Sequence, residues 1–173
     1  MKKTLYIFIS ILFTITINAQ AKKKSEFGIF SAGVGLGLFQ SSKNTLKKDY
    51  SGLNFIADYT FFYKEHLMSA SYVYGTTVQI LGAASSYNEI TIQYGQSFEA
   101  SKIFSIECFA GVGKFEQTSK SDQIQTGGSI STPIKLNLSF RIADGLSFDI
   151  SNIYSINKIN NIFSGNFAIK FKP

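Results

Sequence analysis

Hydrophobic and polar residues alternate strictly over residues 133–156, and the alternation predicts two β-strands joined by a tight turn. Every second residue from Ile134 to Ile142 is apolar, and Lys, Asn, Ser and Arg stand between them. A period of two residues is that of a strand with one apolar face, and a helix does not keep it. After the turn the alternation resumes over residues 146–151, so we expect a β-hairpin.

The turn of this hairpin decides which side chains share a face. A two-residue loop pairs Ala143 with Leu146 and places the two apolar rows on opposite faces. A three-residue loop ending at Gly145, with that glycine in the left-handed conformation, pairs Phe140 with Phe148. Both apolar rows then lie on one face, and we therefore predict the three-residue loop.

The same period recurs along the rest of the chain and predicts about eight strands in all. Beside the hairpin, the predicted strands are residues 27–39, 53–63, 68–75, 89–98, 104–112 and 163–171. Consecutive strands joined by short connections are typical of antiparallel order. The predicted fold class is therefore all-β, with one antiparallel up-and-down barrel.

Charged residues distinguish the two faces of the predicted strands. Asp, Glu, Lys and Arg do not occur at the central apolar positions, and the opposite face is mostly Ser, Gly, Asn, Thr and Gln. A soluble barrel covers its water-facing side densely with charge, whereas this composition suits the hydrogen-bonded interior of a narrow transmembrane barrel. We predict an interior charge network made of Asp58, Glu89, Glu107, Lys135, Arg141, Asp149 and Lys170.

The lengths of the connections support a membrane barrel. They run long, short, long, short, long, short, moderate, which is the order expected when both termini are periplasmic. The long connections, residues 41–49, 76–86 and 116–129, are then extracellular and free to contact partners. A tilted strand of about 10 residues crosses roughly 25 Å, the height of the apolar band.

Aromatic residues fall near both predicted rims, as the aromatic girdles of a membrane barrel do. One rim carries Tyr63, Phe98, Phe104 and Phe171, and the other carries Tyr50, Tyr74 and Tyr154.

The amino-terminal segment predicts export. Residues 1–21 contain two lysines, an apolar run and then small residues, the pattern of a secretory signal peptide with cleavage near residues 19–21. Residues 22–173 are then the barrel domain, and the predicted location is the cell outer membrane. The single Cys108 cannot form an internal disulfide. A net charge of +6 scattered along the chain disfavours nucleic acid as a partner.

Candidate chemistry is sparse. His66 is the only histidine, and with Glu65 and Ser69 it resembles a catalytic trio. The predicted topology places His66 at a periplasmic turn, away from outer-leaflet lipid. One His and one Cys on different strands form no ligand cluster. We therefore expect no catalytic residues, no metal site and no cofactor.

The signal peptide, the strand pattern from Phe27 onward and the terminal run 163–171 resemble the small eight-stranded OmpA/OmpX-like outer-membrane barrels, the "outer membrane protein beta-barrel domain" group. The resemblance covers the chain after the signal peptide. It implies outer-membrane lipid as the surroundings and barrel-insertion machinery as a partner during assembly. That machinery would recognise Phe167, Ile169 and Phe171, although Gly165 sits one residue from the usual glycine position.

The sequence thus favours a non-enzymatic integral outer-membrane barrel with a structural or surface-interaction role. About eight strands leave an interior that side chains fill. Two alternatives stay open: a soluble exported lipocalin-like barrel that binds a hydrophobic ligand, and an outer-membrane enzyme that modifies lipid.

Overall fold

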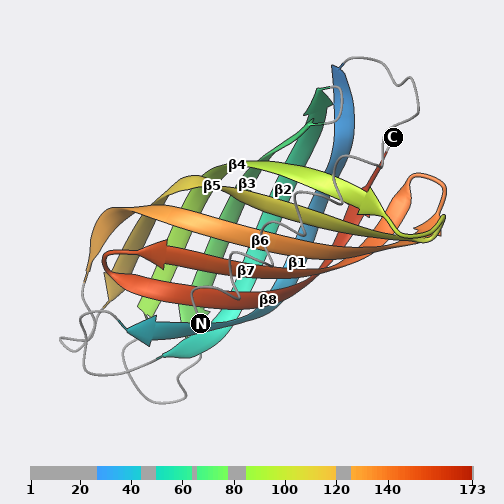
Figure 1. The fold of residues 1–173 in the computed structure, drawn as a ribbon. Coiled ribbons are helices and arrows are strands. Elements are labelled where there is room, and N and C mark those ends of the chain that lie inside the picture. The colour runs from blue at the N-terminus through green and yellow to red at the C-terminus, as the bar shows by residue number, and fades with distance from the viewer. Residues whose placement is uncertain (1–26, 44–49, 64–65, 78–84, 120–125, 173) are drawn as a thin grey trace, which may run out of the picture.

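The alternating segments form a closed antiparallel barrel in the computed structural model, which describes residues 27–43, 50–63, 66–77, 85–119 and 126–172. Each strand pairs with its sequence neighbours, and the last strand pairs with the first (Figure 1). The strands are β1 (Phe27–Lys43), β2 (Ser51–Tyr63), β3 (His66–Thr77), β4 (Ser85–Glu99), β5 (Phe104–Ser119), β6 (Gly127–Ala143), β7 (Leu146–Asn157) and β8 (Asn160–Phe171).

Apolar side chains point outward and polar side chains point into the barrel. On the outside, Leu36 and Ile92 are more than 60% exposed, while Ser151 and Asn137 are buried inside. The predicted fold class and the predicted outward direction of the apolar rows are confirmed. A lipocalin-like barrel needs the reverse arrangement, so that alternative is wrong.

Several strands extend further than predicted at the end that carries the long connections. β1 continues to Lys43, β5 continues to Ser119, and β6 begins at Gly127. The predicted loops at 41–49, 76–86 and 116–129 therefore overlap strands at their edges. Their central parts lie outside the described residues, as does the predicted signal peptide.

The β6–β7 hairpin has the predicted register but a different turn. Phe140 pairs with Phe148 as expected, and Gly145 has a φ of 74°, the left-handed conformation that glycine adopts readily. Next to the turn, however, Ala143 pairs with Leu146. A one-residue register shift between Arg141 and Ala143 absorbs the difference and keeps the apolar rows on one face.

The interior near the long-connection end is apolar. Phe39 packs edge-on against Tyr50 and Tyr87, and Tyr87 stacks on Phe115 with 5.6 Å between ring centroids. We call this buried set the aromatic plug; it consists of Phe39, Tyr50, Ile56, Val73, Tyr87, Phe115, Ile153, Ile159 and Ile162. Tyr50, predicted to belong to a rim girdle, lies inside it.

Both ends of the strand set lie at the short-turn end of the barrel, because the start of β1 pairs with the end of β8, as in Ala32 with Phe171. No helix in the described part of the chain is long and apolar enough to cross a membrane.

Candidate functional site

The lumen contains a buried ion-pair network centred on Lys170. Its ammonium nitrogen lies 3.3 Å from Asp58 Oδ2, 3.2 Å from Glu107 Oε2 and 3.0 Å from Asp149 Oδ2. The side chain of Lys170 is only 2% exposed. Charges removed from water need close partners of opposite sign, and Lys170 has three.

Lys135 crosses the lumen to reach the same network. Its Nζ donates to Asp58 Oδ1 at 2.8 Å and contacts the hydroxyls of Ser69 and Ser71 at 3.0 and 3.2 Å. Asp58 lies on β2 and Lys135 on β6, four strands apart in a ring of eight, so this ion pair spans the barrel. The Lys135 ammonium also lies 4.5 Å from the centre of the Phe109 ring.

Lys172 completes the network. Its Nζ donates to Glu107 Oε1 at 2.8 Å and to Ser139 Oγ at 2.9 Å. Three carboxylates (Asp58, Glu107 and Asp149) and three ammonium groups (Lys135, Lys170 and Lys172) then face one another, so the network is electrically balanced.

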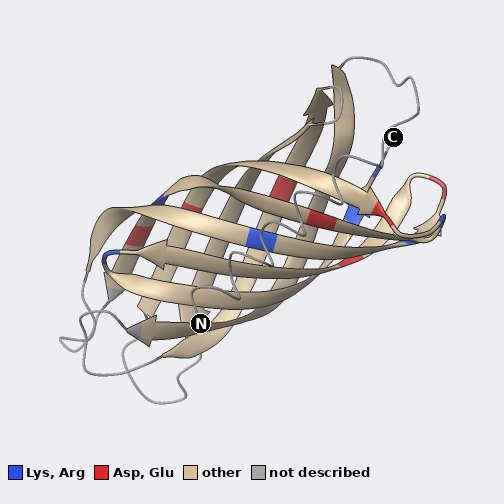
Figure 2. Ribbon diagram, viewed as in Figure 1, with Lys and Arg blue, Asp and Glu red and all other residues tan. Residues whose placement is uncertain are grey.

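The structure brings five of the seven predicted charges into this network: Asp58, Glu107, Lys135, Asp149 and Lys170. Charged residues are sparse along the strands (Figure 2). Sequence reasoning missed Lys172, which lies just beyond the predicted last strand at residues 163–171. The signal was present, because Lys172 continues the inward row of Asn166, Ala168 and Lys170.

Arg141 does not join the network. Its side chain is exposed beside the β6–β7 turn, and its backbone N–H donates to the carbonyl of Ile103. Arg141 still pairs in register with Ser147, but it lies at the turn end of β6, where its side chain is exposed. Alternation predicts the face of the sheet and not the position along the barrel axis, so it misplaced this residue.

Glu89 lies inside the barrel but apart from the network. It is buried, and Ser155 Oγ donates to its Oε1 at 2.5 Å from β7. Within the described residues, no salt bridge joins Glu89 to a Lys, Arg or His side chain.

A third set of polar contacts borders the aromatic plug. The amide oxygen of Gln117 accepts hydrogen bonds from Tyr50 Oη and Asn160 Nδ2, each at 2.8 Å. The lumen thus contains three sets of polar contacts: this one, Glu89 with Ser155, and the ion-pair network.

The possible catalytic trio does not assemble among the described residues. His66 faces outward, where its Nδ1 lies 2.6 Å from Tyr94 Oη. Ser69 faces inward and donates to Asp58, and Glu65 lies outside the described residues. The described part of the chain also holds no group of three His, Cys, Asp or Glu side chains placed to bind a metal.

The predicted assembly residues Phe167, Ile169 and Phe171 lie along one row of β8, and all three are exposed on the outside of the barrel.

Solved structures of small membrane barrels share this fold. Neisserial surface protein A is 9% identical, with a TM-score of 0.70 over 88% of this chain and 100% of that chain. The attachment invasion locus protein Ail of Yersinia pestis is 15% identical, with a TM-score of 0.56 over 83% of this chain and 99% of that chain. The outer membrane protein OprG of Pseudomonas aeruginosa is 10% identical, with a TM-score of 0.55 over 83% and 97%.

No family model matches the chain, and neither does any curated protein. At identities this low the structural likeness establishes the fold. It confirms the predicted eight-stranded barrel of the outer-membrane type.

Proposed function

We propose that this protein is a non-enzymatic integral outer-membrane β-barrel with a structural or surface-interaction role. One observation carries the proposal: exposed apolar side chains cover the outside of a barrel in which Asp58, Glu107 and Asp149 are buried and paired with lysines. In water such an exterior is costly, while in a bilayer it is the required surface. A closed sheet also satisfies its backbone hydrogen bonds without help from solvent.

Gel mobility and fractionation test the membrane assignment. We expect the folded protein to migrate differently before and after boiling, because a closed barrel resists detergent until it is heated. We also expect it to stay with the membrane fraction until detergent is added. Equal mobility of both samples, or release into buffer without detergent, would contradict the proposal.

Surface interaction is assigned to the connections at residues 41–49, 76–86 and 116–129. Their placement outside the cell can be tested in a Cys108→Ser background with a membrane-impermeant thiol reagent. We expect Lys47→Cys to be labelled on intact cells and Asp144→Cys, in the short β6–β7 turn, to be labelled only after the outer membrane is opened. The reverse labelling pattern would show that the barrel has the opposite orientation in the membrane.

We further propose that Phe167, Ile169 and Phe171 form the signal read by the insertion machinery. Phe171→Ala should reduce the amount of heat-modifiable barrel in cells several-fold. Phe163→Ala, on the same face of β8 but at its other end, is the control and should have a much smaller effect. Equal losses for the two variants would point to general destabilisation of β8.

A further inference from the structure

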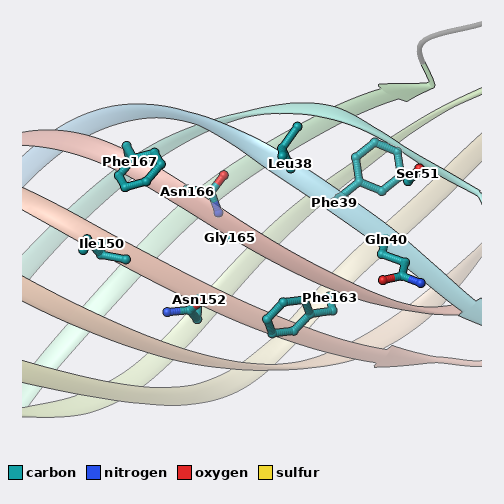
Figure 3. Close-up of a pocket in the computed structure, with 10 residues that line it drawn as sticks. All are labelled: Leu38, Phe39, Gln40, Ser51, Ile150, Asn152, Phe163, Gly165, Asn166 and Phe167. Carbon is teal, nitrogen blue, oxygen red and sulfur yellow. The ribbon is translucent and has the colours of Figure 1, made fainter.

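A hollow of about 480 Å³ lies in the outer wall of the barrel, over β7, β8 and β1 and reaching Ser51 at the start of β2. Its floor is at Gly165, and Phe163 and Phe167 stand on either side of this glycine along β8 (Figure 3). Gly165 pairs with Asn152 of β7 and Leu38 of β1. The two phenylalanines and Leu38 are at least half exposed, so the hollow opens onto the apolar outer surface.

Neither backbone conformation nor crowding requires a glycine at position 165. Its φ is not positive, and an added Cβ would meet only Asn152 Oδ1, at an ordinary contact distance of 3.7 Å. Gly37 on β1 is different, because a Cβ there would collide with the backbone of β8. The missing side chain at Gly165 therefore serves mainly to leave space between the two phenylalanine rings.

The hollow also contains a polar group without a partner. Asn152 interrupts an outward row of β7 that is otherwise apolar or aromatic, and within the described residues nothing hydrogen-bonds its side-chain amide. Exposing an unpaired amide to hydrocarbon is costly. A bound molecule that carries a carbonyl oxygen would reduce this cost by accepting from Asn152 Nδ2.

Charge near the hollow favours an anionic molecule. The β7–β8 connection at the long-connection end carries the exposed Lys158, which follows Asn152, Tyr154 and Ile156 along the outer side of β7. Lysines at the membrane surface attract anionic headgroups. A lipid has an acyl chain, a carbonyl and a headgroup in sequence. The apolar trough, the Asn152 amide and the Lys158 ammonium group follow one another in the same order along β7.

We propose that this hollow is a binding site for one acyl chain of an anionic membrane lipid, and the proposal rests on the membrane assignment above. The acyl chain lies over Gly165 between Phe163 and Phe167. Asn152 Nδ2 donates to the ester or amide carbonyl of the lipid, and Lys158 faces the anionic headgroup.

The chain contains no Trp, so a single introduced Trp reports on its own surroundings. Phe167→Trp places the reporter in the hollow. Ile92→Trp, on β4 at the opposite side of the barrel, is the control. The two positions are matched in exposure, because Phe167 is 60% exposed and Ile92 is 63% exposed. Each full-length variant is reconstituted in phosphatidylcholine vesicles with a minor fraction of phosphatidylglycerol brominated on its acyl chains, which quench Trp fluorescence on contact.

We expect brominated phosphatidylglycerol to associate with the Phe167→Trp reporter about fivefold more strongly than with the Ile92→Trp reporter. Adding Gly165→Leu, which fills the hollow, should abolish the preference. Lys158→Gln and Asn152→Leu should each reduce it. Heat-modifiable migration of each variant confirms that it is folded.

Equal quenching of both reporters would overturn the proposed site while leaving the membrane assignment intact. The same preference for brominated phosphatidylcholine would overturn the anionic headgroup. Protection of the Phe167→Trp reporter from every lipid, together with cross-linking between copies, would show that a second copy covers the hollow instead. Absence of quenching at both positions would overturn the membrane assignment and this site together.

Discussion

Lys170 contacts Asp58, Glu107 and Asp149 from a position almost without solvent. Burying an unpaired ammonium group raises the free energy of the folded state. Here Lys170 is paired, and its positive charge also offsets the repulsion between the three carboxylates. The balance of the network therefore depends on individual residues, and neutralising one member leaves an unmatched charge in the lumen.

Replacing Lys170 with Met should strongly destabilise the barrel. The variant keeps a long apolar side chain but leaves the carboxylates in excess, at an expected cost of about 3–5 kcal/mol in the free energy of unfolding. Urea-induced unfolding of the protein in lipid vesicles, followed by gel mobility, measures the change. Arg141→Met, at an exposed position outside the network, should change stability by no more than about 0.5 kcal/mol. Similar losses in the two variants would argue against the network.

Two buried glutamates should respond oppositely to the same substitution. Glu107→Gln removes a carboxylate that neutralises Lys170 and Lys172, and we expect it to lower the free energy of unfolding by about 3 kcal/mol or more. Glu89 accepts from Ser155 and has no cationic partner within the described ranges, so Glu89→Gln should leave stability unchanged or raise it. The same unfolding assay compares them, and a larger loss for Glu89→Gln would show that its charge is compensated.

At the scale of strands, β1 and β8 approach closely because glycine stands at the inward positions of β1. An added Cβ at Gly37 would lie too near the carbonyl oxygen of Gly165 and the side chain of Asn166. Lumen side chains of β8, including Lys170 beside Gly33, occupy the space that larger residues on β1 would need.

Gly37→Ala should therefore destabilise the barrel, while Gly165→Ala on the paired strand should be tolerated. Overpacking at Gly37 is expected to cost about 1–3 kcal/mol, whereas the lipid-facing position has room for a methyl group. Unfolding midpoints of the two variants in vesicles provide the comparison. If both alanines were equally harmless, the seam between β1 and β8 would be looser than the structure indicates.

Alternation along the strands was enough to predict which residues face outward, including the rows through Leu36, Ile92 and Phe167. It failed where a strand slips by one residue. Between Ile29 and Ser31 a register shift changes the side of the sheet on which the following residues lie, so Ile29 and Val34 are both exposed although an even spacing does not separate them. A period of two contains no information about such shifts.

The interior was only partly predictable. Charged residues identified the ion-pair network, because the outer face of the strands is apolar and the lumen is the polar side of the barrel. The aromatic plug was not foreseen, since Phe39, Tyr87 and Phe115 lie on strands whose outer rows are also apolar. Apolar residues on both faces remove the contrast on which the sequence argument depends. The hollow at Gly165 is lined by residues from four strands, and only the pairing register of those strands shows that the residues lie together.

For the whole molecule, the stacked contacts of the lumen act together as a barrier. The aromatic plug, the Glu89–Ser155 contact beside it and the ion-pair network all fill the lumen, and the latter two are made by side chains from strands that are not neighbours. A solute would have to displace all of them, and eight strands leave little space to do so.

Vesicles containing the protein should therefore not become permeable to small sugars. In a light-scattering swelling assay, proteoliposomes placed in an isotonic sugar solution should swell no faster than protein-free vesicles of the same lipid. A swelling rate that rises with the amount of folded protein would show that the lumen conducts and would contradict a filled interior.

Because β1 pairs with β8, segments from opposite ends of the strand set must meet before either strand loses its open edge. Pairings between residues so distant along the chain form slowly, since the entropy of closing a long loop opposes them. Until they form, unpaired backbone groups remain on both edges, and hydrocarbon cannot hydrogen-bond them. Strands therefore cannot enter the bilayer one at a time as the chain is synthesised, and joining of the first and last strands is expected to limit the folding rate.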